Sequence, residues 1–288
     1  MTQILSAAPI KKKITKELKA ECKFLKEKNI IPYLKVILVG NNPASLIYTS
    51  SKKKYCERVG ARCDIVTLDS FTSEQDFLKN ISEINADSGV HGLIVQLPLP
   101  KHLAHLDIGK LIKKEKDVDG FHPENIYALM RNDSSNQHFV SCTPKGILTL
   151  LKEYQIELSN KNIIIIGRSM IVGKPLALLL TNQDATVTLA HSQTKNLPEL
   201  ASRADVIISA IGRAHFIDRK FLSLTKNQIL IDVGMNKNAQ EEICGDIDFE
   251  QVENHVSAIT PVPGGIGPMT IISLVQNLLQ AARNQLSF

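Results

Sequence analysis

The stretch IIIIGRSMIVGKPLALLL, Ile163–Leu180, decides the fold of this protein. Its four isoleucines form a continuous apolar run, which is typical of a central parallel strand covered on both faces. Gly167 then begins a turn, and the apolar run that starts at Leu176 predicts a helix. A strand, a glycine turn and a helix in this order predict a parallel α/β unit.

The glycine turn departs from two known phosphate-binding motifs. Arg168 and Ser169 follow Gly167, and the next glycine is Gly173, which does not match G-x-G-x-x-G. It is not a P-loop either, because a proline stands after the lysine where that motif needs a hydroxyl for magnesium. A glycine turn before a helix N-terminus can still bind phosphate. Both a nucleotide site and a purely structural turn therefore remain open.

The next predicted strand bears on the kind of nucleotide. NAD-binding folds typically carry Asp or Glu at the end of this strand, where it binds the ribose hydroxyls. Here the strand ATVTLAH leads into Ser192 without a carboxylate, and Arg168 is available in the preceding turn. A cation and a hydroxyl at these positions favour a ribose phosphate, and therefore NADP over NAD. The alternative is a surface arginine and an ordinary loop hydroxyl.

Strands and helices alternate along the rest of the chain. Helices are predicted at Pro43–Val59, with Asn42 as the N-cap, at SEQDFLKNISEINAD, with a Ser cap, and at TPKGILTLLKEY, with Thr143 as the cap. The chain ends with the helical segment IISLVQNLLQAARNQL. Further strands are predicted at YLKVILVG, DIVTLDS, GVHGLIVQLPLP, DVIISAIG and QILIDVG. This alternation predicts parallel sheets in two α/β units.

The composition is that of a globular protein with one large domain or two medium ones: 288 residues, 43% hydrophobic and 22% charged. No apolar run approaches the ~20 residues of a transmembrane helix, and the N-terminus lacks a signal-peptide pattern. Five cysteines without a C-x-x-C pair are typical of reduced thiols, so we expect a cytoplasmic protein. A net charge of +5, spread along the chain, suits small anionic ligands better than nucleic acid or a membrane.

A run of three lysines lies on the first predicted helix, in YTSSKKK. At ~100° per residue, Lys52 shares a stripe with two tyrosines, whereas Lys53 and Lys54 point away from it. Gln96 is predicted at the carboxyl end of a strand, where ligands bind in open α/β sheets, and its neutral amide can hold a lysine. Two interpretations remain open: Lys52 reaches past the stripe to water, or it enters a site for acid–base chemistry.

Two other patterns could indicate a metal site. Asp117 and Asp119 in KDVDG stand beside a glycine and have no histidine ligands near them in the sequence, so a turn carboxylate that binds an organic ligand is the better interpretation. His102 and His105 are spaced H-x-x-H. We do not interpret this pair as a metal site either. We therefore expect no metal.

Seven segments together resemble the family of bifunctional methylenetetrahydrofolate dehydrogenase/methenyltetrahydrofolate cyclohydrolases. They follow the family's order over nearly the whole chain: YTSSKKK, VQLPLP, KDVDG, CTPKG, GRSMIVGKP, DVGMN and TPVPGGIGPMT. Two alternatives remain at this point. One is another two-lobed NADP dehydrogenase, for example for a shikimate-like acid, and the other is a non-catalytic nucleotide-binding module.

The resemblance implies an α/β fold of two lobes with an active-site cleft between them. Residues 1–140, completed by a C-terminal helix at 270–288, would form the catalytic folate-binding lobe. Residues 141–269 would form a Rossmann-like NADP-binding domain with a parallel sheet. The implied activity is oxidation of 5,10-methylenetetrahydrofolate with NADP, followed by hydrolysis of the methenyl product to 10-formyltetrahydrofolate. A homodimer is also implied.

The resemblance further implies roles for individual residues. Lys52 would be the catalytic lysine, Gln96 would orient it, Tyr48 would be its neighbour in the folate site, and Asp119 would bind the pterin. The folate site would also contain Val95, Leu97, Pro263, Gly264, Gly265, Gly267 and Pro268. The cofactor site would contain Gly167, Arg168, Ser169 and Ser192, with Met235 near the nicotinamide.

Overall fold

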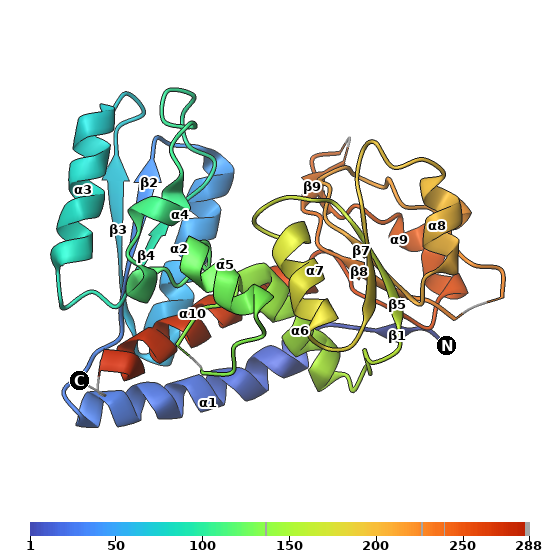
Figure 1. Ribbon diagram of the computed structural model, residues 1–288, viewed down its shortest axis with the longest axis horizontal. Helices are drawn as coiled ribbons and strands as arrows, with labels where there is room; N and C mark the ends of the chain where they lie inside the picture. The colour runs from blue at the N-terminus through green and yellow to red at the C-terminus, as the bar shows by residue number, and fades with distance from the viewer. Residues whose placement is uncertain (136, 226, 239, 286–288) are drawn as a thin grey trace. The chain divides into compact units, whose positions relative to one another are not determined.

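The computed structural model describes residues 1–135, 137–225, 227–238 and 240–285 of an α/β protein (Figure 1). The chain divides into two compact units. Unit 1 comprises Met1–Lys12 and Thr143–Thr270, and unit 2 comprises Lys13–Cys142 and the chain from Ile271 onward. Unit 1 thus includes the first twelve residues, which the sequence-based division assigns to the other lobe. Residues 286–288 of the predicted C-terminal helix lie outside the described residues.

Unit 1 contains a six-stranded parallel sheet in the order β1-β11-β8-β7-β5-β6. The strands predicted from the sequence are present as β5 (Asn162–Ile166), β6 (Thr186–Ala190), β7 (Val206–Ser209) and β8 (Ile229–Asp232). The added strands β1 (Gln3–Ile4) and β11 (Ala258–Ile259) are only two residues long, too short for a hydrophobic pattern to predict. A separate antiparallel pair is formed by β9 (Asn236–Lys237) and β10 (Ile243–Cys244).

The order of strands reverses at β5. The chain passes from β5 to its neighbour β6 on one side and then to β7 on the other side. In open α/β sheets, ligands bind outside the carboxyl ends of the strands at such a switch point. The residues that follow β5, β6 and β7 are therefore the expected position of a ligand in this unit.

The helices of unit 1 surround a core of strand side chains. The helical segments are α6 (Cys142–Glu153), α7 (Gly173–Thr181), α8 (Leu197–Arg203), η2 (Arg219–Phe221), α9 (Phe249–Val252) and η3 (Glu253–His255). The core includes Ile164, Ile207 and Leu230 from the sheet and Phe221 from η2. The prediction that Thr143 caps α6 is wrong, because the helix begins one residue earlier and the Thr143 hydroxyl instead lies 3.1 Å from that of Thr270.

Unit 2 contains a three-stranded parallel sheet in the order β3-β2-β4, flanked by helices (Figure 1). The strands are β2 (Tyr33–Val39), β3 (Arg62–Leu68) and β4 (Gly92–Val95). The principal helices are α1 (Ala7–Glu27), which begins in unit 1 and enters unit 2 at Lys13, α2 (Pro43–Val59), α3 (Glu74–Ala86) and α5 (Pro123–Met130). Two short segments, α4 (Ile108–Leu111) and η1 (Lys114–Lys116), follow β4. The predicted bounds and N-cap of α2 are confirmed, since Asn42 Oδ1 accepts a hydrogen bond from the Ser45 N–H at 3.1 Å. The predicted Ser73 cap of α3 is also present.

The last helix, α10 (Ile266–Asn284), begins before the segment predicted for it and ties the KDVDG segment in place. Asn277 is fully buried on this helix. Its Nδ2 donates hydrogen bonds to the carbonyls of Val118, at 2.8 Å, and Val140, at 3.0 Å. Gly92 also packs closely against this region, because a side chain there would collide with Val118 of the KDVDG segment and with Leu278 of α10.

No helix within the described ranges of the chain is long and apolar enough to cross a membrane.

We expect Asn277→Ala to destabilise the protein. The change leaves two buried carbonyls without their donor, at a cost of about 2–3 kcal/mol in the free energy of unfolding. Denaturant unfolding measures this loss. Arg283→Ala on the same helix is the control, because its ion pair with Glu21 is at the surface and is worth at most about 1 kcal/mol. Equal losses in the two variants would contradict the role given to Asn277.

Candidate functional site

A buried lysine lies on α2. Lys52 is only 5% exposed, although two further lysines follow it directly. Tyr55, on the same stripe, is also buried. The Lys53 side chain is 41% exposed, and Lys54 is exposed. The predicted orientation of the three lysines is therefore confirmed, while the catalytic role of Lys52 stays a prediction.

The Lys52 amine lies between an amide and an aromatic ring. Its Nζ donates a hydrogen bond to Gln96 Oε1 at 3.0 Å and lies 4.6 Å from the centroid of the Tyr48 ring. Gln96 directly follows β4, and its Nε2 donates to the Leu97 carbonyl at 2.7 Å, which fixes the amide with its oxygen toward the lysine. Neither neighbour neutralises the ammonium. Within the described part of the chain, Gln96 is its one hydrogen-bond acceptor, which leaves further N–H groups for a ligand.

The two aspartates of KDVDG have different environments. Asp117 is 1% exposed and accepts hydrogen bonds from the backbone N–H groups of Gly120 and His122 and from Asn125 Nδ2. Burial raises the pKa of Asp117 to about 6. Asp119 is half-buried, and no donor among the described residues bonds to its carboxylate. Asp117 therefore maintains the turn, whereas Asp119 has a carboxylate available for a ligand.

Three of the predicted folate-site residues meet at one small cavity in unit 2. Val95, Leu97 and Asp119 line it together with Phe121 from the following turn. Its volume is only about 20 Å³, which is room for about one water molecule. The cavity is therefore too small to enclose a large ligand, and these residues could form only part of the wall of a larger site.

The remaining predicted folate residues lie in unit 1, where β11 leads into α10. Gly267 and Pro268 belong to the first turn of that helix, a favourable position for proline. Gly265 is required by packing, because a Cβ there would lie 2.6 Å from the Pro261 carbonyl oxygen. Gly264 has a φ of +108°, which also favours glycine. Met235 lies beside this segment, since its Cε is 3.4 Å from where a Cβ on Gly267 would be.

A pocket of about 340 Å³ occupies the switch point of the large sheet. Its walls come from the ends of β5, β6 and β7, from the loops after them and from Leu197 at the start of α8. The predicted residues Gly167, Arg168, Ser169 and Ser192 line it, together with Ile166, His191, Leu197, Ala210, Ile211, Arg213 and Phe216. Met235 is not part of this lining. Sequence reasoning missed Arg213, which could have been found as the first cation after the strand on the other side of the switch.

The glycine turn at this pocket is fixed by close packing of the backbone. Gly167 has a φ of +124°, and a Cβ there would lie 2.4 Å from the Ala210 carbonyl oxygen. At Gly173 a Cβ would lie 1.9 Å from the Gly167 carbonyl oxygen. Ser169 holds the turn at the start of α7, because its Oγ accepts from the N–H groups of Val172 and Gly173. Its hydroxyl proton is still available to a ligand.

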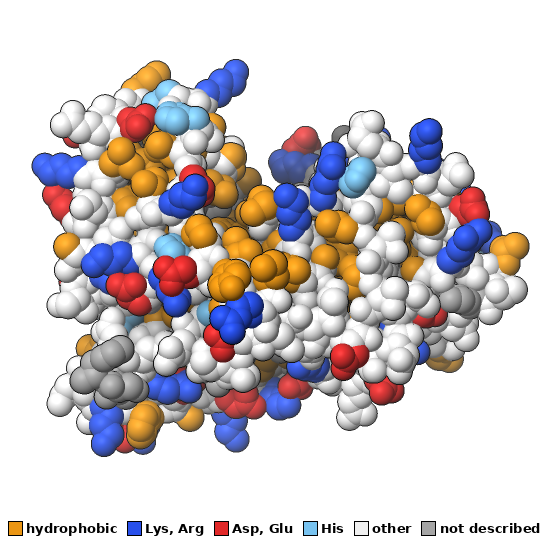
Figure 2. Space-filling view, viewed as in Figure 1, with side chains coloured by type: hydrophobic (Ala, Val, Ile, Leu, Met, Phe, Trp, Pro, Cys, Tyr) orange, Lys and Arg blue, Asp and Glu red, His pale blue; other side chains and the backbone are white. Residues whose placement is uncertain are grey.

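The electrostatics of this pocket favour an anion. Arg168 and Arg213 both line it, and the residues that line it include no carboxylate. Figure 2 shows basic side chains and a histidine, with an acidic side chain beside them, at the upper edge of unit 1. The pocket therefore fits a phosphate-bearing cofactor such as NADP. No group of three metal-ligating side chains suitable for a metal ion occurs in the part of the chain that the structure describes.

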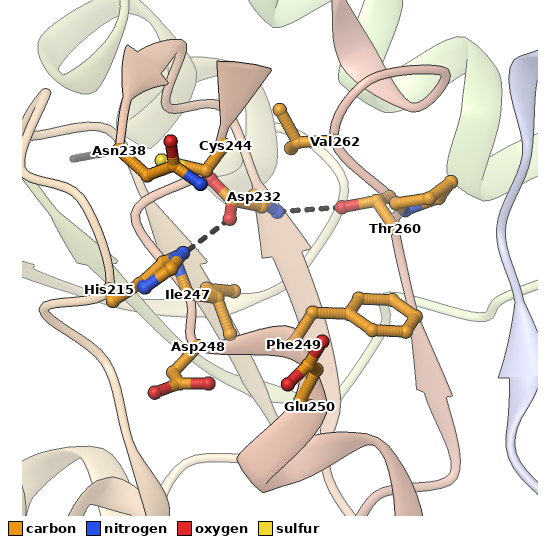
Figure 3. Close-up of a pocket in the computed structure, with 12 residues that line it drawn as sticks. His215, Asp232, Asn238, Cys244, Ile247, Asp248, Phe249, Glu250, Thr260 and Val262 are labelled. Carbon is orange, nitrogen blue, oxygen red and sulfur yellow. Dashed lines mark hydrogen bonds between the residues drawn. The ribbon is translucent and has the colours of Figure 1, made fainter. Parts of the chain in front are cut away.

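A second cavity in unit 1, of about 570 Å³, lies beside the end of β8 (Figure 3). It contains the side chain of Asp232, which is 3% exposed. This carboxylate accepts hydrogen bonds from the N–H groups of Gly234, Asp246 and Ile247 at 2.8–3.0 Å. Burial nevertheless raises the pKa of Asp232 to about 7. Asp232 is the first residue of the DVGMN segment, but no local pattern in the sequence predicted its burial in a cavity.

The larger sheet with its switch-point pocket defines a Rossmann-type nucleotide-binding protein that carries a second α/β unit. Residues 5–119 match the catalytic domain of tetrahydrofolate dehydrogenase/cyclohydrolase, and residues 141–286 match the NAD(P)-binding domain of the same family. The chain belongs to this family.

Similar proteins support the assignment over the full length. The chain is 46% identical to the bifunctional protein FolD of Campylobacter hominis over 285 residues, which covers 99% of this chain and 98% of the relative. It is 46% identical to FolD of Halalkalibacterium halodurans over 267 residues, 93% of this chain and 94% of the relative.

Solved structures of related enzymes have the same fold. The bifunctional enzyme FolD from Campylobacter jejuni aligns with a TM-score of 0.93 at 42% identity, over 99% of this chain and 100% of that one. The Trypanosoma brucei enzyme, complexed with NADP cofactor and inhibitor, aligns with a TM-score of 0.92 at 30% identity, over 100% and 99% of the two chains.

The raised pKa of Asp232 predicts a pH-dependent stability. An aspartate in an unfolded chain has a pKa of about 3.9, so the folded protein holds this proton more tightly. The group therefore contributes stability that is fully present below about pH 4 and is lost as the pH rises through about 7. Asp232→Asn removes this titration at nearly constant size.

We expect the stability of the parent relative to Asp232→Asn to fall as the pH rises from about 4 to 8, on the order of a few kcal/mol. Urea unfolding of both proteins at several pH values measures the difference, in which the other titrating groups cancel. A difference that stays constant or grows with pH would contradict the raised pKa.

Proposed function

We propose that this protein catalyses two successive steps of one-carbon folate metabolism. It oxidises 5,10-methylenetetrahydrofolate to the 5,10-methenyl compound with NADP and then hydrolyses that product to 10-formyltetrahydrofolate. The observation that carries the proposal is the buried Lys52 amine, held at 3.0 Å by the neutral Gln96, in a chain of this family. Membership of the family favours this function over a shikimate-type dehydrogenase or a non-catalytic nucleotide-binding module.

Lys52 is assigned to the hydrolytic step. Addition of water to the methenyl carbon forms a C–O bond, opening of the ring breaks a C–N bond, and one proton is released. These transfers need a positioned acid–base group, which is worth ~10²–10⁴-fold in rate. Gln96 and Tyr48 hold the amine without removing its charge or its remaining N–H groups. Hydride transfer moves no proton at the lysine, so Lys52 contributes to that step only by positioning the substrate.

Asp119 is assigned to the pterin. A carboxylate can accept hydrogen bonds from a ring N–H and the adjacent amino group together, which fixes orientation as well as affinity. The lack of a donor to Asp119 among the described residues supports this role. Val95 and Leu97, next to Asp119 at the same cavity, would supply apolar contacts for the ring. The segment with Pro263, Gly264, Gly265, Gly267 and Pro268 is proposed as a further part of the folate site.

The switch-point pocket is assigned to the cofactor. Gly167 allows close approach of the backbone, Arg168 and Ser192 would hold the ribose phosphate, and the Ser169 hydroxyl would donate to a phosphate oxygen. Met235 is proposed for the nicotinamide side. NADP, when bound, supplies the hydride acceptor.

Three further assignments belong to the proposal. Residues 1–140 with the helix at 270–288 carry the folate chemistry, and residues 141–269 bind the cofactor. A division near residue 140 agrees with the family matches at 5–119 and 141–286, although the second match also includes residues 270–286. The grouping of the chain from Ile271 onward with unit 2 supports the assignment of the last helix to the folate lobe. The protein acts in the cytoplasm, consistent with five buried cysteines that form no disulfide. It acts as a homodimer, as the family resemblance implies.

Replacement of Lys52 tests its catalytic role. Lys52→Met keeps the length of the side chain and removes the amine, so we expect the hydrolysis of supplied methenyltetrahydrofolate to fall ~10²-fold or more. Formation of NADPH from methylenetetrahydrofolate should fall less, because only the position of the substrate is disturbed. The two steps are assayed separately on the same preparation.

Lys53→Met and Lys54→Met are matched controls on the same helix. Both side chains are outside the buried stripe, so both variants should keep both activities near the parent rates. Near-parent hydrolysis by Lys52→Met would remove the catalytic assignment and leave Lys52 as a structural lysine.

Replacement of Asp119 tests the pterin contact. Asp119→Ala should weaken tetrahydrofolate binding by about ten- to a hundredfold, as expected for charge-assisted hydrogen bonds, and so impair both reactions. Calorimetry measures the binding directly. Asp133→Ala, in an exposed loop of the same unit, should have no such effect. Unchanged folate affinity in Asp119→Ala would show that the pterin binds elsewhere.

A further inference from the structure

We propose that Arg213 is a specificity-determining residue of the cofactor pocket, a second cation that binds the ribose phosphate together with Arg168. The inference rests on the proposed function, because it assumes that the pocket holds NADP. The two arginines come from different loops, Arg168 after β5 and Arg213 after β7, and line the same pocket. The hydroxyl of Ser192 lines it as well.

The charge of the expected ligand group calls for two cations. A phosphate monoester carries about −1.5 to −2 charges at neutral pH. One guanidinium neutralises only part of this charge. The pocket lining contains no acidic side chain that would pair with the second guanidinium in place of the ligand. Two arginines with a serine hydroxyl are thus a matched set for a phosphate monoester, whereas the unphosphorylated ribose of NAD offers them no charge.

A buried carboxylate fixes the backbone of Arg213. Asp246 is fully buried, and its Oδ1 accepts from the Arg213 N–H at 2.8 Å. Its Oδ2 accepts from Ile211 N–H at 2.8 Å, Gly212 N–H at 3.3 Å and Ser209 Oγ at 3.0 Å. The whole loop after β7 is therefore held on one side chain. Such a loop presents Arg213 at a defined position in the pocket wall.

An aromatic pair restrains the side chain of Arg213. Its guanidinium lies 4.6 Å from the centroid of the Phe216 ring, a cation–π distance. Phe216 in turn packs on Phe221, with ring centroids 5.5 Å apart, and Phe221 is 1% exposed. Among the described residues Arg213 has no carboxylate partner, whereas Arg203 pairs with Glu199. Arg213 is thus an exposed arginine whose guanidinium rests on an aromatic ring and whose charge is available to a ligand.

One competing role has to be separated from phosphate binding. An arginine at this position can also stack on the adenine ring, which every adenine nucleotide carries. Two probes make the distinction: adenosine 2′,5′-bisphosphate has the ribose phosphate, and 5′-AMP lacks it. A residue that binds the ribose phosphate affects only the first, whereas a stacking residue affects both.

The test is calorimetric titration of both probes into parent and variant proteins in buffer of fixed, low salt. We expect Arg213→Ala to weaken the bisphosphate about tenfold or more and to change 5′-AMP affinity less than about threefold. Arg213→Lys keeps the charge and should retain part of the preference. Arg219→Ala, an exposed arginine of the same unit outside the pocket lining, should leave both affinities unchanged.

Each outcome has a distinct meaning. Equal losses for the two probes would overturn the proposal in favour of adenine stacking, and an unchanged preference in both Arg213 variants would overturn it in favour of a solvated arginine. If Arg168→Ala loses the preference while Arg213→Ala keeps it, NADP selection stands and only the role of Arg213 fails. If the parent itself does not prefer the bisphosphate, the assignment of NADP fails first.

Discussion

Parallel strands bring their carboxyl ends to one edge of a sheet, and both candidate sites of this protein depend on that constraint. In unit 1, the ends of β5, β6 and β7 create a pocket from loops that are far apart in the sequence. In unit 2, Gln96 follows β4 directly, and α2, which starts after β2, returns Lys52 to it. Each strand would tolerate many apolar sequences, but the residues after each strand have to carry the chemistry. This is the general rule for open α/β sheets.

Within each unit, the number of hydrogen-bond partners distinguishes charged side chains with a structural role from those that we assign to function. Asp246 is fully buried and accepts five hydrogen bonds, two on Oδ1 and three on Oδ2, so it holds loops and has no capacity left for a ligand. Asp117 has the same structural character, whereas Asp119, two residues later, has no donor among the described residues. Lys52 is buried against a neutral amide and a ring, and no acidic side chain among the described residues pairs with it. We therefore assign the chemistry to polar groups that still have hydrogen-bonding capacity in the folded protein.

Much of this arrangement was predictable from the sequence. The four isoleucines of β5, the turn at Gly167 and the Asn42–Pro43 start of α2 are local patterns with a direct physical meaning, and the structure has all three. The helical period alone placed Lys52 inside and Lys54 outside. The contact between Arg213 and Asp246 could not be predicted in this way, because it joins residues 33 positions apart through a backbone N–H that any residue carries. The short strands β1 and β11, and the burial of Asp232, likewise depend on tertiary packing rather than on a local pattern.

The central claim is that one protein carries out both steps of this reaction pair, and the most direct measurement is a single time course with 5,10-methylenetetrahydrofolate and NADP. NADPH is followed by its absorbance, and methenyl- and 10-formyltetrahydrofolate are separated and quantified at each time point. The account predicts that 10-formyltetrahydrofolate forms in step with NADPH, faster than free methenyltetrahydrofolate hydrolyses under the same conditions without protein. NADPH formation with the methenyl compound as the final product, or no NADPH formation at all, would contradict it.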